Sequence, residues 1–193
     1  MSEILESNEE RMIALGLAWE SIRAAVTSSE YKISIEKLPP VFAKKSGAFV
    51  TAYKVEHGRE ELRGCIGVPK PILPLAEAIG SAARDTVIAD PRFPRVRESE
   101  LKDLVIEVEV LSSFHEMKFN NLQELYDQVT IGTDGLVLYS KFGSSLLLPP
   151  VPVKYNWNAE EFIDALCRKA WVEKKILLDK KTQIMKFQAQ VIR

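Results

Sequence analysis

The stretch that decides the fold is residues 48–68, AFVTAYKVEHGREELRGCIGV. Its first part, Ala48 to Val55, carries the β-branched and aromatic residues typical of a strand, and Leu62 to Val68 has the pattern of a return strand. The short connection between them contains Gly58, which suits a turn. The pattern therefore predicts a β-hairpin, in which neighbouring strands run antiparallel.

Helical patterns occur on both sides of this hairpin. Ser7 and Glu10 have the spacing of a capping box, and apolar residues follow at helical spacing up to Val26. A second helix is predicted over about 74–89, with Pro74 in its first turn. Further on, an Asn-x-x-Glu pattern predicts a short helix from residue 121 and a third long helix from residue 158.

The remaining strands lie in the second half of the chain. The alternation of residues 104–111 predicts a strand, and a second hairpin is predicted from 129–131 and 136–139 about an Asp-Gly turn. Further strands are predicted at 145–148 and 185–191. Hairpins separated by helices favour an α+β fold, with a largely antiparallel sheet flanked by helices. The length predicts one domain over residues 1–193, with room for a larger and a smaller lobe.

Composition excludes several classes of protein. The net charge is −1 and the pI is about 6.2, so no overall positive field attracts nucleic acid. The acidic start lacks the features of a signal peptide, and no apolar run is long enough to span a membrane. The two cysteines and two histidines have no zinc-site spacing. We therefore expect a soluble cytoplasmic protein without a metal site or a cofactor.

The most site-like feature is Cys65, which stands between Gly64 and Gly67 and two positions after Arg63. If residues 62–68 are extended, Leu62, Ile66 and Val68 face the core, whereas Arg63, Cys65 and Gly67 face the other side. A guanidinium beside a thiol favours the reactive thiolate. The glycines indicate a bulge, a bend or a backbone that another group must approach closely. Together these residues predict a small site for an anionic or electrophilic ligand.

A structural explanation of the same residues stays open. A free cysteine is usually a small buried hydrophobe, and a glycine beside it can serve only to let a helix pack on the sheet. No activating base is specified by the local spacing, although His115 is available as one.

Two other groups of residues are candidates for the same site. Asp90 precedes Pro91, so the second helix should end there in a rigid turn. Arg92 then either lies in solvent or points at the anion that Arg63 holds. Glu107 and Glu109 share one face of a strand, which is usually exposed; facing the cysteine strand, one of them could pair with Arg63 or act as an acid or base.

Several motifs occur in a characteristic order: the first strand from Gly47 to Thr51, Leu62-Arg63-Gly64-Cys65-Ile66-Gly67, Asp90-Pro91-Arg92-Phe93-Pro94, Ile131-Gly132-x-x-Gly135, Leu147-Leu148-Pro149, Trp157 and Cys167-x-Lys169-Ala170. In this order they resemble the AMMECR-type family, whose members are similar to protein A of the AmmeMemoRadiSam system. The resemblance covers about residues 10–192. It implies a single α+β unit with two lobes around an antiparallel sheet. Two positions depart from the family pattern: Asp134 replaces a common histidine, and Pro150 replaces a common glutamine or glutamate.

The family has been suspected of enzymatic activity and of binding nucleotides or nucleic acid, and its genes accompany those of Memo-type and radical-SAM proteins. The resemblance therefore implies these as partners. Our first hypothesis is a thiol-dependent enzyme in which Cys65 and Arg63 are catalytic, in a cleft where Gly64, Gly67, Arg92 and Glu109 bind a small anionic substrate. The alternatives are a non-catalytic module that binds a nucleotide or nucleic acid, and an adaptor with an exposed apolar patch around Trp157 and prolines 149–152. Whether the chain is an enzyme is left open by the sequence.

Overall fold

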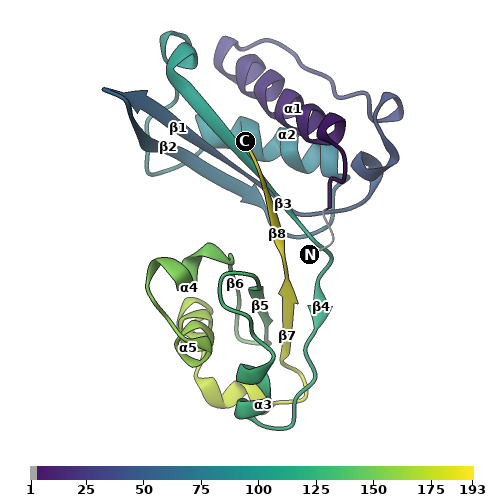
Figure 1. Cartoon of the computed structure of the whole chain (residues 1–193), viewed down its shortest axis with the longest axis vertical. Coiled ribbons are helices and arrows are strands. Elements are labelled where there is room, and N and C mark those ends of the chain that lie inside the picture. The colour runs from purple at the N-terminus through teal and green to yellow at the C-terminus, as the bar shows by residue number, and fades with distance from the viewer. Residues whose placement is uncertain (1–3) are drawn as a thin grey trace. The chain divides into compact units, whose positions relative to one another are not determined.

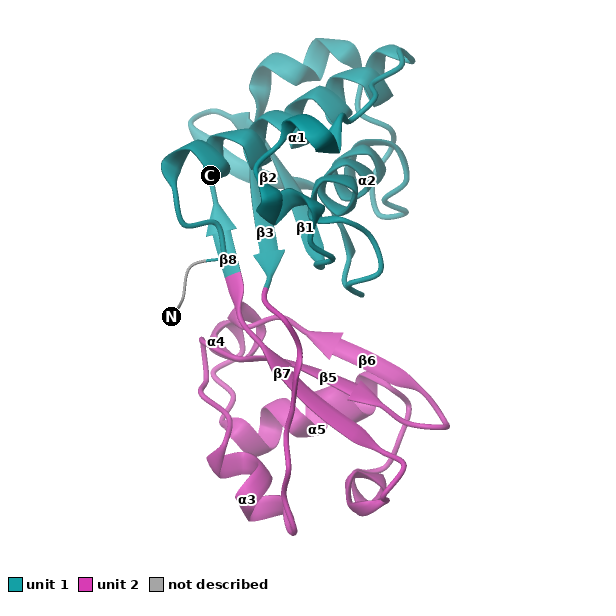
Figure 2. Ribbon diagram, turned by 90° about the vertical axis from the view of Figure 1, so that its right-hand side faces the viewer, with its two compact units in different colours: residues 1–111, 190–193 teal, residues 112–189 magenta. Residues whose placement is uncertain are grey.

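The computed structural model describes residues 4–193, whose contacts divide the chain into two units (Figure 2). Unit 1 comprises Met1–Leu111 and Gln190–Arg193, and unit 2 comprises Ser112–Ala189. Each unit has its own cluster of buried apolar side chains. The predicted α+β architecture, with antiparallel sheets flanked by helices, is confirmed.

Unit 1 is a four-stranded sheet with two long helices on one of its faces (Figure 1). The strand order is β2-β1-β3-β8, so β2 is an edge strand, and β1 pairs antiparallel with both β2 and β3. The regular elements of this sheet and its helices are α1 (Asn8–Thr27), β1 (Ala48–Glu56), β2 (Arg59–Val68), α2 (Leu75–Ile88), β3 (Leu104–Leu111) and β8 (Ala189–Ile192). Three short 3₁₀ turns complete it: η1 (Ile35–Lys37), η2 (Pro40–Ala43) and η3 (Glu98–Asp103).

Local sequence signals fix the long helices. The side chain of Ser7 accepts a hydrogen bond from the Glu10 backbone, and the Glu10 carboxylate accepts one from the Ser7 backbone, so the predicted capping box is present. Helix α2 begins directly after Pro74 and ends before Asp90, close to the predicted limits. Its small buried residues, including Ala82 and Ala83, let it lie close against β1 and β2.

The two faces of the unit 1 sheet differ in chemistry. Residues 48, 50 and 52 of β1 and residues 106, 108 and 110 of β3 are buried under the helices. The alternate positions face the other way and include Thr51, Cys65, Glu107 and Glu109. These four residues therefore lie on the face that the helices do not cover, whereas Gly64 pairs with Ala52 and packs against α2.

Unit 2 is a smaller four-stranded sheet with order β4-β7-β5-β6, packed against α5 (Ala159–Lys169). Its other elements are β4 (His115–Glu116), α3 (Leu122–Asp127), β5 (Gly135–Tyr139), β6 (Ser144–Leu147), α4 (Pro150–Lys154), the 3₁₀ turn η4 (Lys174–Leu178) and β7 (Gln183–Phe187). The capping box of Asn158 and Glu161 is present at the start of α5, as predicted.

Two strand predictions in the second half of the chain need correction, and one short helix was not predicted. Residues 129–131 form no strand, because Asp134 accepts the Thr130 backbone N–H and holds this segment as a turn; β5 pairs instead with β6 and β7. The predicted last strand, 185–191, is interrupted at Gln188, and its halves join different sheets as β7 and β8. The proline cluster after residue 148 contains the short helix α4, which was not predicted.

Within residues 4–193, none of the helices combines the length and the apolar character that crossing a bilayer requires.

Candidate functional site

A bulge in β2 determines where Arg63 and its neighbours point. Ala52 of β1 pairs with Gly64 and Tyr53 pairs with Leu62, which leaves Arg63 as the extra residue. The bulge changes the alternation of side chains, so Leu62, which we expected in the core, is 42% exposed. Ile66 and Val68 lie opposite the core residues of β1, as predicted.

The side chain of Arg63 is engaged away from the thiol. Its Nε and Nη2 donate to the two carboxylate oxygens of Glu100, at 3.0 and 3.2 Å, and its Nη1 donates to the Pro94 carbonyl at 2.9 Å. Only 11% of the side chain is exposed. Arg63 lowers the pKa of Glu100 through these hydrogen bonds. The expectation that Arg63 lies beside the Cys65 thiol is therefore wrong.

The two glycines of the motif have packing partners. A Cβ atom at Gly64 would stand 2.3 Å from the carbonyl oxygen of Thr86, so this glycine lets α2 approach the sheet. A Cβ atom at Gly67 would stand 2.1 Å from Cδ1 of Phe49, so the ring of that residue lies over Gly67. Close approach was predicted at these positions, and in this structure the approaching groups belong to the chain itself.

The backbone of Cys65 is held at the edge of the sheet by the turn after α2. Its N–H donates to Oδ2 of Asp90 at 2.9 Å, and its carbonyl accepts from Nη2 of Arg92 at 3.2 Å. Arg92 also donates to both oxygens of Asp90, at 3.0 and 2.7 Å. Asp90 is 4% exposed, and hydrogen bonds, first from Arg92, hold its pKa well below its usual range.

Arg92 is therefore the arginine that lies near the cysteine. Its side chain is 54% exposed, and the pKa of its guanidinium is raised, chiefly by Asp90 and then by Cys65. The Asp90-Pro91-Arg92 segment closes the outer edge of β2 where no further strand pairs. It thus combines a structural role at the edge with a cation close to the sulfur.

Cys65 is half-buried, and the Thr51 hydroxyl donates to its sulfur at 3.3 Å. Burial is the largest influence and raises the pKa of this thiol, whereas the hydrogen bond from Thr51 lowers it. The charge of Glu109 raises this pKa by less than Thr51 lowers it, and the charge of Arg92 lowers it by less again. The prediction of a thiolate favoured by Arg63 is wrong: the neutral thiol is the favoured form.

Glu109 is the second unusual group on this face. It is 8% exposed, and its Oε2 is buried without a hydrogen-bond partner among the described residues. Burial, followed by the charge of Glu107, raises the pKa of Glu109 to about 7. A carboxyl group with a pKa near neutrality can accept or release a proton at physiological pH.

Cys167, the other cysteine, is packed among apolar side chains of unit 2. It is 3% exposed in the apolar cluster of unit 2, and burial, followed by the charge of Asp164, raises its pKa to about 11. Cys167 therefore provides an internal reference for an inert thiol.

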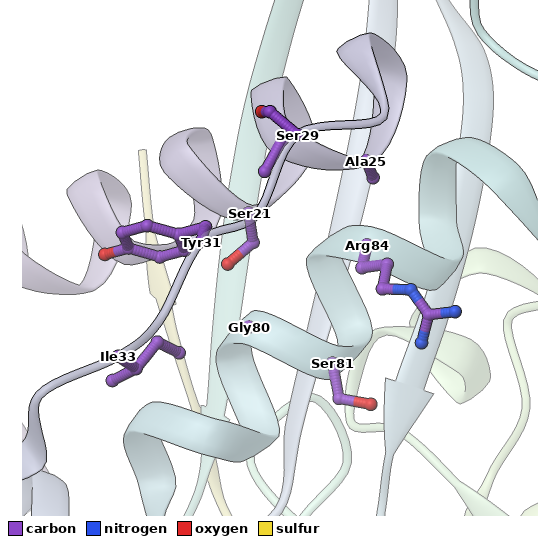
Figure 3. Close-up of a pocket in the computed structure, with 9 residues that line it drawn as sticks. Ser21, Ala25, Ser29, Tyr31, Ile33, Gly80, Ser81 and Arg84 are labelled. Atoms are coloured by element: carbon purple, nitrogen blue, oxygen red, sulfur yellow. The ribbon is translucent and has the colours of Figure 1, made fainter.

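Unit 1 contains two cavities that were not predicted from the sequence. One has a volume of about 470 Å³ and lies beside Arg63, where it is lined by Lys54, Arg95 and Arg97 among others. The signal that could have found it is the repeated arginine at alternate positions after Pro94. The other has a volume of about 310 Å³ and lies between α1, α2 and the loop after α1 (Figure 3).

The second cavity has little charge. Figure 3 shows Tyr31 and Ile33 on the loop and Ser81 and Arg84 on α2. A Cβ atom at Gly80 would stand 2.6 Å from Ile33, so this glycine makes room for the loop. Arg84 is its only cationic lining residue among those described.

The positions that depart from the family pattern lie in unit 2. Asp134 is buried, accepts the Thr130 N–H at 2.9 Å and lies 3.4 Å from Nζ of Lys186, which are structural contacts.

Trp157 is half-buried against the apolar cluster of unit 2 and stacks with exposed Tyr155. The exposed apolar surface expected around Trp157 therefore consists of neighbours such as Tyr155 rather than of Trp157 itself.

Comparison with known proteins agrees with these motifs. Residues 15–192 match the AMMECR1 family. A protein of Methanocaldococcus jannaschii is 42% identical over 160 residues, which cover 83% of this chain and 79% of that protein. A protein of Thermofilum pendens is 36% identical over 191 residues, which cover 96% and 90%. The crystal structure of an uncharacterised protein from Pyrococcus horikoshii has a TM-score of 0.78 and 37% identity, covering 93% of this chain and 88% of that one. This chain belongs to the AMMECR1 family.

Proposed function

We propose that unit 1 carries a thiol-dependent group-transfer site, in which Cys65 is the nucleophile and Glu109 the general base. The single observation that carries this proposal is the buried Glu109 carboxyl, whose Oε2 has no hydrogen-bond partner among the described residues. Burial raises the pKa of this carboxyl to about 7, and its charge in turn raises the pKa of the Cys65 thiol. A neutral thiol needs a base at the moment of attack, and a carboxylate that titrates near neutrality suits that task.

The proposed step transfers an acyl group to sulfur. The thiol proton of Cys65 passes to the Glu109 carboxylate, directly or through one water, while the sulfur forms a bond to the electrophilic carbonyl carbon. The bond from that carbon to the leaving group breaks, and Glu109 returns the proton to the leaving group. Thr51, whose hydroxyl donates to the sulfur, stabilises the negative charge that develops there.

Arg92 is the residue that we assign to the anionic part of a small substrate. Its Nη1 makes no hydrogen bond to any part of the chain that the structure describes, and more than half of the side chain is exposed. Asp90 fixes the guanidinium in place, so the free donors are oriented before a ligand binds. Arg63 has a positioning role in this proposal, because it anchors the strand next to Cys65 without touching the thiol.

The test is acylation of the full chain by p-nitrophenyl acetate, with the site of the adduct identified by mass spectrometry at pH 5 to 10. We expect Cys65 to be acylated at a rate that rises through pH ~7, following Glu109, and then levels off. Glu109→Gln should lower the rate at pH 8 by about 100-fold or more. Cys167→Ser should leave the rate unchanged, because that thiol is buried in unit 2.

Glu107→Gln is the matched control for Glu109→Gln, since both carboxylates lie on the same strand face. It keeps the base but removes a charge that raises the Glu109 pKa, so the rising part of the pH profile should move to lower pH. A wild-type rate that instead follows ionisation of the thiol, and that Glu109→Gln leaves intact, would rule out the general-base role.

The competing proposal is a binding module without chemistry, for a nucleotide or a nucleic-acid strand. The basic cavity beside Arg63 favours the binding of an anion in unit 1. Under this proposal Cys65→Ala keeps the affinity for the anion. A cytoplasmic location, and work as an adaptor with Memo-type and radical-SAM proteins, stay predictions from the sequence and the family resemblance.

A further inference from the structure

The basic cavity of unit 1 lies where three segments meet. Lys54 comes from β1, Arg63 from β2, and Arg95 and Arg97 from the segment between α2 and η3. The volume of about 470 Å³ is within the range of small-molecule sites and exceeds what an inorganic anion alone fills.

The charge of this cavity is strongly positive although the whole chain is nearly neutral. Four cationic side chains, those of Lys54, Arg63, Arg95 and Arg97, line it together with one carboxylate, Glu100, so its net charge is 4 − 1 = +3. Glu100 is already neutralised by its two hydrogen bonds with Arg63. Such a local excess attracts a multiply charged anion.

Two of these cations are not used by the fold. The side chains of Arg95 and Arg97 form no ion pair with the residues that the structure describes, and both are exposed residues that line the cavity. Lys54 has a partner in Glu56, which is itself exposed and easily exchanged for a ligand. Arginine residues without a structural partner suit bidentate binding of phosphate oxygens.

Arg63 is an ordered lining residue whose guanidinium has unused N–H donors. A guanidinium has five N–H groups, and the three hydrogen bonds of Arg63 to Glu100 and Pro94 use three of them. The two that remain belong to a side chain that is only 11% exposed and already ordered. A ligand that meets them therefore loses little free energy in ordering this residue.

The cavity also has an apolar wall beside its cations. Phe93 and Pro94 line it, and the guanidinium of Arg92 lies 5.5 Å from the centroid of the Phe93 ring. This cation–π contact helps to hold the Phe93 ring in place. A ligand that fits must then carry both a strongly anionic group and a less polar organic part.

We propose that this cavity binds a small organic phosphate, with its phosphate between Arg95, Arg97 and Arg63 and its organic part against Phe93 and Pro94. A phosphate monoester carries a charge close to −2 at neutral pH and three acceptor oxygens, which match the excess charge and the free donors. The inference goes beyond group transfer at Cys65, because binding here needs no reaction of the thiol.

The test is isothermal titration calorimetry of the full chain with adenosine monophosphate, ribose 5-phosphate and inorganic phosphate. We expect saturable binding of the two esters, tighter than that of inorganic phosphate, and competition among all three. Arg95→Ala and Arg97→Ala should each weaken binding roughly tenfold or more, since each removes hydrogen bonds to a charged group. Both side chains are exposed, and alanine keeps the backbone N–H that Arg97 donates to Glu100, so the variants should fold normally.

Arg84→Ala is the matched control, because it removes an exposed arginine from the second cavity (Figure 3). It should leave the affinity unchanged. Equal weakening by Arg84→Ala, or no effect of Arg95→Ala and Arg97→Ala, would overturn the assignment to this cavity, as would failure of all three phosphates to bind at millimolar concentration.

Two further measurements distinguish phosphate binding in this cavity from acyl transfer at Cys65 and from nucleic-acid binding. Cys65→Ser should bind adenosine monophosphate with wild-type affinity, so loss of acylation and loss of phosphate binding are independent outcomes. A single-stranded oligonucleotide should bind no more tightly than the monophosphate. Affinity that increases steeply with oligonucleotide length and falls steeply with salt would instead mean a nucleic-acid surface and would contradict a small-molecule site.

Discussion

At the scale of single residues, the two arginines of the motifs have exchanged their expected roles. Arg63 is two positions from Cys65 in sequence, but the bulge at this residue directs it to Glu100. Arg92 is far from Cys65 in sequence, yet it binds the Cys65 carbonyl and influences the thiol. The partner of a charged side chain is decided by which groups can meet it with good geometry, and sequence distance has little influence on that.

Glu109 should make stability depend on pH in a direction opposite to that of most carboxylates. Its folded pKa of about 7 exceeds the ordinary value of 4.5, so native chains keep a proton that unfolded chains lose between these values. This contribution to stability is complete below pH ~4.5 and lost as pH rises through 7. The test is the free energy of unfolding of Glu109→Gln minus that of wild type. We expect this difference to be larger at pH 8 than at pH 4.5 by roughly 3 kcal/mol.

Urea unfolding at the two pH values measures this difference, and comparison with wild type removes the effects of all other groups. Glu107→Gln should shift the pH window downwards, because the Glu107 charge is one cause of the raised pKa. The same difference between Glu109→Gln and wild type at both pH values would mean that Glu109 has an ordinary pKa.

At the scale of elements, the contact between α2 and β2 depends on Gly64 and Thr86. The Thr86 hydroxyl accepts the Ile66 N–H at 3.1 Å and lies 2.8 Å from the Val50 and Ala82 carbonyl oxygens, so one side chain links helix α2 with strands β1 and β2. This arrangement requires the helix to approach closely, which Gly64 permits.

Alanine substitutions at the two glycines of the motif should lower the free energy of unfolding by different amounts. Gly64→Ala places a Cβ against the α2 backbone, which cannot move alone, and we expect a loss of roughly 3 kcal/mol or more. Gly67→Ala meets the Phe49 ring, which can turn aside, and should lose roughly 1–3 kcal/mol. Gly16→Ala in α1 has open space and should gain roughly 0.5–1 kcal/mol.

Chemical denaturation of the three variants gives these values. Equal losses for Gly64→Ala and Gly67→Ala would show that α2 adjusts as easily as a single ring. A loss for Gly16→Ala would contradict the open space at this exposed helical position.

At the scale of the whole molecule, the two apolar clusters share no residue. We therefore expect each unit to have its own free energy of unfolding. Ile79 lies in the cluster of unit 1 and Leu166 in that of unit 2, and both are fully buried. Replacing either with alanine should cost roughly 2–5 kcal/mol, mainly in its own unit. Native-state hydrogen exchange should then show lower protection of unit 2 amides in Leu166→Ala and of unit 1 amides in Ile79→Ala.

A uniform loss of protection across residues 4–193 in both variants would contradict independent units, and would support the prediction of one domain that unfolds as a whole.

The sequence by itself determined the features that depend on near neighbours. The capping residues Ser7 and Asn158 bond to groups three positions away, and the strand pattern of 48–68 encodes its own hairpin. The family could likewise be predicted, because its motifs are short and ordered. Asp90 was correctly expected to end α2, since the following proline constrains its backbone.

Only the tertiary structure decided the chemistry of the candidate site. Arg63 pairs with Glu100, and it lines one cavity with Arg95 and Arg97, all of which are far from it in sequence. The burial of Glu109 likewise depends on residues that are distant in sequence. One extra residue in β2 redirected Arg63, and an interruption at Gln188 divided the last strand between two sheets. Burial and charge depend on which surfaces meet in space, and local spacing carries no information about that meeting.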